Sequence, residues 1–132
     1  MRLSRRTFAA AAKGRSLGGV ARAKIGTRVL YTISESVRVR FTVERAARGR
    51  KVNGRCRRST APTSRTRRCT RYRKLRGSFT HDGKQGTNRF RFTARLRGRK
   101  LRPGRYRLVA TATDAAGNMA KPKRARFRVV RR

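Results

Sequence analysis

Two cysteines and a group of arginines lie between positions 46 and 73, and they are the residues of this chain best able to do chemistry. Cys56 and Cys69 are thirteen positions apart in a segment, 46–70, that is rich in Arg, Ser and Gly and contains Pro62. We expect this segment to be a long, exposed basic loop closed by a disulfide, which contributes about 3 kcal/mol in the chain-entropy model. Such a bond implies an oxidising compartment. The alternative is two free thiols in a cytosolic protein.

Arginine side chains surround the two cysteines and offer a second kind of chemistry. Planar guanidinium groups suit phosphate and sulfate, and an aromatic ring among them can stack on a base or a sugar. The competing interpretation is an ordinary solvated loop, because aromatic residues are few and no Walker, helix-turn-helix, zinc-finger or ribonucleoprotein motif is present. A polyanion site on this loop would use Arg55, Arg57, Arg58, Arg65, Arg67, Arg68, Arg71, Arg73 and Tyr72.

Catalytic and metal chemistry find little support in the sequence. With one His and four acidic residues, no nucleophile, base and orienting group can be assembled around His81 and Asp82, and we expect Asp82-Gly83 to be a hairpin turn. Two cysteines without a C-x-x-C motif cannot supply a usual zinc site. Asp114 and Asn118 fall short of the ~6–8 oxygen ligands that calcium takes, and a turn is the better interpretation. We therefore expect no catalytic site, metal, cofactor or small-molecule substrate.

The net charge is the extreme feature of the composition. The 132 residues include 41 Lys and Arg against 4 Asp and Glu, a formal charge of +37. A surface this cationic attracts polyanions, so nucleic acids, polysaccharides, anionic polymers of the cell envelope and acidic lipid headgroups are candidate partners. GC-rich codons, which favour arginine, are a competing origin of the charge. No apolar run approaches the ~20 residues of a membrane-spanning helix.

Alternation of apolar and polar residues predicts an all-β chain forming one domain, 1–132. An opening edge strand and a flexible Gly/Ala/Arg-rich connection occupy 1–26, the basic loop is inserted at 46–70, and 81–86 is a polar turn. Outward arginines of neighbouring strands should face each other, which is unfavourable and should make stability depend on salt. The seven strand candidates are 2–9, 27–33, 37–44, 71–80, 88–96, 105–113 and 124–130.

The stretch 101–118, LRPGRYRLVATATDAAGN, resembles the end of immunoglobulin-like and fibronectin type III-like modules of secreted and cell-surface proteins from high-GC bacteria. It contains their Leu-x-Pro-Gly-x-Tyr-x-Leu pattern before the penultimate strand and their Ala-x-Asp-x-Ala-Gly-Asn pattern after it. A second stretch, 31–45, looks like their first core hairpin. The matching residues of the longer stretch are Leu101, Pro103, Gly104, Tyr106, Leu108, Ala112, Asp114, Ala116, Gly117 and Asn118.

This resemblance implies a single antiparallel immunoglobulin-like sandwich of about seven strands, with Tyr106 as a tyrosine corner whose hydroxyl returns to nearby backbone. It also implies an extracellular or cell-surface location. Residues 4–12 imitate a twin-arginine export signal, but Lys13 ends the apolar part after five residues. A signal needs ~7–15 apolar residues, so we expect an edge strand there instead.

Two functional hypotheses follow from the charge and the resemblance. The first is a non-enzymatic structural or adhesion module of a secreted or surface-attached bacterial protein that docks on anionic polymers. The second is a protein that binds nucleic acid without sequence preference through an arginine-rich β-sandwich surface. The redox state of the cysteines separates them, because an oxidised pair indicates a location outside the cytosol.

Overall fold

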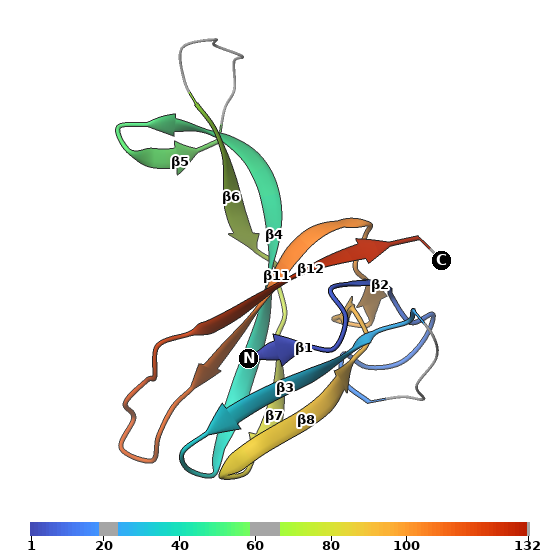
Figure 1. Ribbon diagram of the computed structural model, residues 1–132, viewed down its shortest axis with the longest axis vertical. Helices are drawn as coiled ribbons and strands as arrows, with labels where there is room; N and C mark the ends of the chain where they lie inside the picture. Colours follow the sequence, from blue (N-terminus) through green and yellow to red (C-terminus); the bar gives the residue numbers. More distant parts are fainter. Residues whose placement is uncertain (19–23, 59–66, 132) are drawn as a thin grey trace.

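The structure is a computed structural model that describes residues 1–18, 24–58 and 67–131. Within these residues the regular structure is all β, and no helix occurs. The strands form a three-stranded sheet, a seven-stranded sheet and a small two-stranded hairpin (Figure 1). The all-β class predicted from the alternating pattern is therefore confirmed.

Most pairs of neighbouring strands in the two larger sheets join segments that are far apart in the sequence. The three-stranded sheet has the order β1 (Arg2–Leu3), β3 (Thr27–Ile33), β8 (Gly86–Phe92). The small hairpin is made by β9 (Arg95–Leu96) and β10 (Arg99–Lys100). The seven-stranded sheet contains β2 (Thr7–Ala9), β12 (Lys123–Val130), β11 (Gly104–Ala112), β4 (Val37–Val52), β5 (Arg55–Arg57), β6 (Arg68–Lys74) and β7 (Phe79–Gly83).

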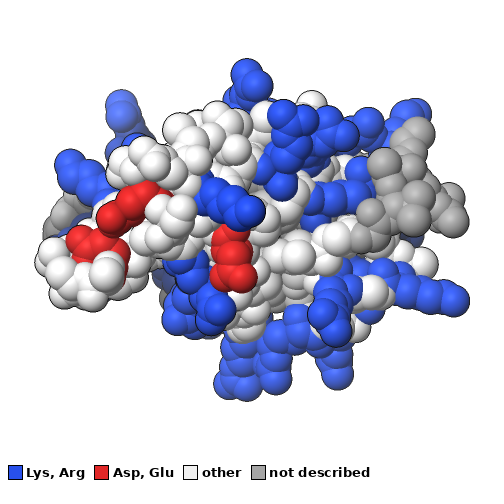
Figure 2. Space-filling model, turned by 90° about the horizontal axis from the view of Figure 1, so that it is seen from below, with Lys and Arg blue, Asp and Glu red and all other residues white. Residues whose placement is uncertain are grey.

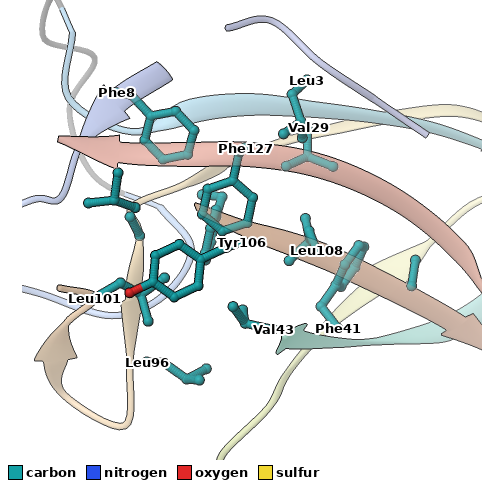
Figure 3. Packing of buried hydrophobic residues seen from close by; sticks show 14 of the residues in the cluster. Leu3, Phe8, Val29, Phe41, Val43, Leu96, Leu101, Tyr106, Leu108 and Phe127 are labelled. Carbon is teal, nitrogen blue, oxygen red and sulfur yellow. The ribbon is translucent and has the colours of Figure 1, made fainter. Parts of the chain in front are cut away.

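One cluster of buried side chains joins the two larger sheets (Figure 3). The rings of Phe41 and Phe90, from opposite sheets, have centroids 4.9 Å apart, and those of Phe92 and Phe127 are 5.6 Å apart. Tyr106 stacks on Phe127 at 5.4 Å and is 2 % exposed. Edge-to-face and offset ring pairs add about 0.5–1.5 kcal/mol each beyond the area they bury. The inward-facing residues predicted from the alternation form this core.

The expected single antiparallel sandwich of about seven strands differs from the structure in two ways. Twelve strands are present in the described residues where about seven were expected, and the β9–β10 hairpin forms a third sheet beside the two that a sandwich has. The pairing is also mixed, because β2 runs parallel to β12, with Phe8 beside Val129. The expected edge strand 2–9 divides into β1 and β2, which belong to different sheets. Phe8 is fully buried, so the residues that imitate an export signal contribute to the core.

Much of the connection that was expected to be flexible is held by hydrogen bonds from Arg95. This guanidinium, 9 % exposed, donates to the carbonyls of Ala11, Ala12, Gly14 and Gly98 at 2.6–3.1 Å. A buried cation needs such partners, because burying an unpaired charge is very costly. The alternating pattern of the expected strand 88–96 predicted correctly that Ala94 and Leu96 point inward. The same pattern predicted that Arg95 points outward, and that prediction was wrong.

Candidate polyanion-binding surface

The segment expected to be a loop is instead largely a three-stranded ribbon, which we call the arm. Strand β4 continues to Val52, whereas the strand predicted from the sequence ended at residue 44. In this extension β4 pairs with β5 on one side and with β6 on the other. The arm extends away from the packed sheets at the top of Figure 1. Residues 59–66, and with them Arg65, lie outside the described residues. The arm carries the cysteines and most of the arginines selected from the sequence.

The expected disulfide is present, and it crosses the arm. Cys56 on β5 and Cys69 on β6 are joined by an S–S bond of 2.02 Å, and both are register neighbours of β4, opposite Lys51 and Gly49 respectively. A Cβ atom added to Gly49 would lie 2.5 Å from Sγ of Cys56 and 2.9 Å from the carbonyl oxygen of Arg57. The disulfide therefore ties the two outer strands together across β4, above a position where only glycine fits.

Arginines occupy both faces of the arm because strand residues alternate between faces. The register pairs Arg50 with both Arg57 and Arg68, and on the other face it pairs Arg45 with Arg73. Like charges directly opposite each other destabilise a sheet. An anion bound along the arm would relieve that repulsion.

At the base of the arm, Tyr72, Arg107 and Glu44 form a cluster that fixes one guanidinium. The Arg107 guanidinium lies over the Tyr72 ring, 3.9 Å from its centroid, and its Nε donates to the Glu44 carboxylate. Cation–π contacts contribute about 0.5–2 kcal/mol, depending on desolvation. One face of Tyr72 is thus covered by Arg107, which leaves less of the ring for stacking on a base than the sequence suggested.

A basic cleft of about 660 Å³ opens beside this cluster, which we call the arginine cleft. It is assembled from segments far apart in sequence: the N-terminal residues, β6, β11 and β12. Two of its arginines, Arg124 and Arg126, are exposed on β12, and Arg107 is half-buried. The cleft is lined by Met1, Arg2, Leu3, Arg6, Thr70, Tyr72, Arg107, Arg124, Ala125 and Arg126.

The register explains why cations gather here. Arg107 faces Arg126 across β11 and β12, and Arg105 faces Arg128 two pairs further along, on the same face of the sheet. Glu44 lies opposite Arg107 on the other side of β11, and it neutralises one guanidinium of this row. Multiple guanidinium groups around one cavity can hold phosphate or sulfate oxygens through charge-assisted hydrogen bonds. The cleft therefore offers convergent donors, whereas the arm offers a linear array.

Basic side chains cover much of the surface on other faces too. Figure 2, seen from below, shows Lys and Arg around most of the outline and a few acidic side chains on one half. The exposed acid Asp82 pairs with Arg38 at 3.1 Å. This pair is 71 % and 84 % exposed, so it contributes little to stability. An anion approaching from most directions therefore meets positive charge, and the arginine cleft is distinguished by shape rather than by sign.

The predicted site residues divide between the arm and the cleft. Arg55 and Arg57 lie on β5, Arg58 directly follows it, and Arg67 directly precedes β6. Arg68, Arg71 and Arg73 lie on β6 with Tyr72. Of the predicted residues, Tyr72 alone lines the described part of the arginine cleft. Sequence reasoning missed Arg2, Arg6, Arg107, Arg124 and Arg126, although the outward alternation of arginines on the last two strands was a usable signal.

His81 and Asp82 lie in strand β7, so the expected hairpin turn at Asp82-Gly83 is wrong; the chain turns at 84–85 instead. The Tyr31 hydroxyl is hydrogen-bonded to Nδ1 of His81. Burial lowers the pKa of His81, against the opposing effect of the Asp82 carboxylate. Burial and then Asp82 raise the pKa of Tyr31 to about 12. A neutral imidazole accepting from a neutral phenol is consistent with both directions, and this pair supports packing between the sheets.

The residues that carried the resemblance have structural roles. The Tyr106 hydroxyl donates to the carbonyl of Arg102 at 2.5 Å. Oδ1 of Asp114 accepts hydrogen bonds from the amides of Ala116 and Asn118 at 3.0 and 2.8 Å, and Gly117 has a positive φ of 85°. The expected tight turn after the penultimate strand is present, and the Asp114 carboxylate is used to form it.

Comparisons with known proteins give no relative to reason from. No protein-family model, curated protein or solved structure matches this chain. The described residues include no group of three or more His, Cys, Asp or Glu placed to hold a metal ion. The same part of the chain contains no helix that is long and apolar enough to cross a membrane.

Proposed function

We propose that this protein is a non-enzymatic binding module that docks on phosphate- or sulfate-bearing polymers through the arginine cleft and the arm. The observation that carries the proposal is the convergence of five arginines, from the N-terminal residues, β11 and β12, on one cleft of about 660 Å³. A charge excess produced by codon usage alone would scatter arginines without hollowing a site around them. The arm extends the same charge along a ribbon, as a long polymer requires.

The disulfide supports a location outside the cytosol, on the cell surface or secreted, because such bonds persist in oxidising compartments. We further propose an immunoglobulin-like arrangement of the sandwich. The support is the hydroxyl of Tyr106, which reaches a carbonyl four residues upstream, as in the tyrosine corner of such folds. An adhesive or spacing role on anionic envelope polymers or polysaccharides fits both features.

The competing hypothesis is sequence-independent binding of nucleic acid. Arginine side chains would bind the phosphates of a nucleic-acid backbone as well as the anionic groups of other polymers. Single-strand binding, however, gains from open aromatic platforms, and the Tyr72 ring has Arg107 on one face. This arrangement favours recognition of anionic groups over recognition of bases.

The test is a salt titration of binding to heparin and to duplex DNA, with the double variant R124A/R126A and the matched double variant R89A/R99A. Both variants remove two exposed arginines, but Arg89 and Arg99 lie on β8 and β10, away from the cleft. We expect R124A/R126A to weaken heparin binding by about tenfold for each charge-assisted hydrogen bond that the substitution removes. The control should weaken binding by less than about threefold.

Equal losses of affinity in the two variants would contradict the proposed cleft and leave only a general cationic surface. Tight DNA binding that persists at physiological salt, with clearly weaker heparin binding, would favour the nucleic-acid hypothesis instead. Melting temperatures of both variants, measured in parallel, separate loss of binding from loss of folding.

A further inference from the structure

Strand β12 has a free stretch along one edge of the seven-stranded sheet. On one side it pairs with β11 from Lys123 to Val129. On the other side it pairs with β2 only from Arg128 onwards, so among the described residues no strand covers 123–127 there. A strand edge without a partner presents amide and carbonyl groups that can pair with another chain.

One hydrogen bond shows which backbone groups of β12 point towards this edge. The amide of Arg128 donates to the carbonyl of Arg6 at 2.6 Å, on the side of β2. Alternate residues of an antiparallel strand direct their backbone groups to the same side, so those of Arg124 and Arg126 also point away from β11. Because each residue carries one amide donor and one carbonyl acceptor, the free stretch offers two donors and two acceptors.

The arginine cleft lies along this free stretch. Its lining includes Ala125, which packs against the core, together with Arg124 and Arg126, which are exposed on the other face of the strand. Met1 and Leu3, on the core side, line it as well. A cleft that takes residues from both faces of one strand reaches the edge of its sheet. Part of its volume of about 660 Å³ is therefore space beside the backbone of β12.

The side chains along the free stretch determine which kind of strand fits there. Successive side chains of an added strand would point to opposite faces. Those on one face would meet Arg124 and Arg126, and those on the other would meet the apolar side chains of Met1 and Leu3. Opposite charges across a strand pair are stabilising and like charges are destabilising. The edge therefore suits alternating acidic and apolar residues, and it disfavours a second copy of β12, which would place arginine against arginine.

We propose that an extended acidic segment of a partner protein adds to the seven-stranded sheet as an antiparallel strand along residues 123–127 of β12. The backbone groups of Arg124 and Arg126 hold the segment, and its acidic side chains contact the two guanidinium groups. In strand addition, main-chain hydrogen bonds provide affinity and alternate side chains provide specificity. The attraction of acidic groups rests on the proposed function, whereas the strand pairing rests on the free backbone groups.

The test is calorimetric titration with an end-capped heptapeptide in which glutamate and valine alternate, with glutamate at both ends. At about 0.1 M ionic strength, where the Debye length is about 10 Å, we expect one site per chain. Two comparison peptides carry N-methyl groups, one on the glutamate amides and one on the valine amides. Antiparallel addition turns the glutamate amides towards β12, so their methylation should weaken binding at least about tenfold. Methylation of the valine amides should leave the affinity unchanged.

A block peptide separates strand addition from general attraction to a cationic surface. It has the same composition, but its glutamates stand together at one end and its valines at the other. The charge is kept, whereas the alternation that matches the two sides of the cleft is lost. We expect the block peptide to bind at least about tenfold more weakly than the alternating one.

Two substitutions of Arg126 test the same edge from the side of the protein. R126A and R126P remove the same guanidinium, but only R126P also removes the outward amide. Proline is accepted on an edge strand where its nitrogen faces away from the neighbouring strand. We expect R126P to bind the alternating peptide at least about threefold more weakly than R126A does. Both variants should bind heparin equally, and their melting temperatures show whether both fold.

Equal affinities of the two N-methylated peptides would overturn the proposal, and so would equal affinities of the block and alternating peptides. Self-association of the chain that R126P abolishes would show that the edge takes a second copy, which also overturns it. The failure of the proposed function looks different. In that case R124A/R126A would weaken heparin binding no more than the R89A/R99A control does, whatever the N-methylated peptides show.

Discussion

Replacing Glu44 with glutamine removes the carboxylate that balances a row of cations. Glu44 lies between Lys74 and Arg107 in the register, and Arg126 follows on the next strand. The side chains of Arg107 and Glu44 are 26 % and 20 % exposed. Exposed ion pairs contribute about 0–1 kcal/mol, whereas breaking a fully buried pair costs about 3–5 kcal/mol. This pair lies between those limits, so we expect E44Q to lower the free energy of unfolding by about 2 kcal/mol.

For a chain of this size, that decrease in stability corresponds to a decrease in melting temperature of roughly 6–10 °C. The assay is urea denaturation of the oxidised protein at low ionic strength and again at about 1 M NaCl, where the Debye length falls to about 3 Å. The cost of E44Q should shrink at high salt, because screening weakens the repulsion among the remaining cations. The matched control is E35Q, which neutralises an exposed acid in a turn and should cost less than about 0.5 kcal/mol.

Equal destabilisation by E44Q and E35Q would refute the reasoning. It would mean that each acid acts only through the net charge of +37, with no particular role for the cluster at the base of the arm. A cost of E44Q that stays constant between low and high salt would refute the repulsion part alone and assign the effect to the missing hydrogen bond.

Three further perturbations test other parts of the structure. Gly49→Ala should make the disulfide strained when it closes, because the added Cβ would lie 2.5 Å from Sγ of Cys56. We therefore expect mass spectrometry to find a larger fraction of free thiol than in the unchanged protein. Full oxidation with unchanged stability would contradict this expectation. The double replacement of Cys56 and Cys69 by serine should lower unfolding free energy by up to about 3 kcal/mol, measured by urea denaturation, and a decrease below about 0.5 kcal/mol would show that strand pairing alone holds the arm. Because burial lowers the pKa of His81, the unfolded chain takes up a proton first, and stability should fall as pH decreases from about 6.5 towards the lower folded value. His81→Gln should flatten that slope in denaturation curves measured from pH 7.5 to 5, and an unchanged slope would assign it to other groups.

The sequence predicted the part of the fold that is built by burial. Alternation over 37–44 placed Val39, Phe41 and Val43 inward, and all three are at most 2 % exposed. Beyond residue 44 the same strand continues for eight residues, but it leaves the core and both of its faces carry polar or small residues. Periodicity reports burial rather than backbone conformation, so the arm was invisible to it.

The arginine cleft could not be predicted for a different reason. The cleft is lined by residues from distant parts of the sequence, such as Arg2, Tyr72 and Arg126, which meet only through strand pairing. No local pattern fixes which strands become neighbours, whereas the disulfide needed only two cysteines and was predicted. The inward turn of Arg95 was missed because three of its four carbonyl partners lie more than eighty residues earlier.

The parallel pairing of β2 with β12 has a consequence for the order in which the chain folds. Residues 7–9 find their partners at 128–130, so this pairing cannot form on a ribosome until nearly all of the 132 residues have emerged. Until then Phe8 has no Phe127 to stack on at 5.4 Å, and the core remains open at one end. Contacts of such long sequence separation slow folding, so the cysteines of the arm, only 13 positions apart, can meet before the two large sheets close on each other.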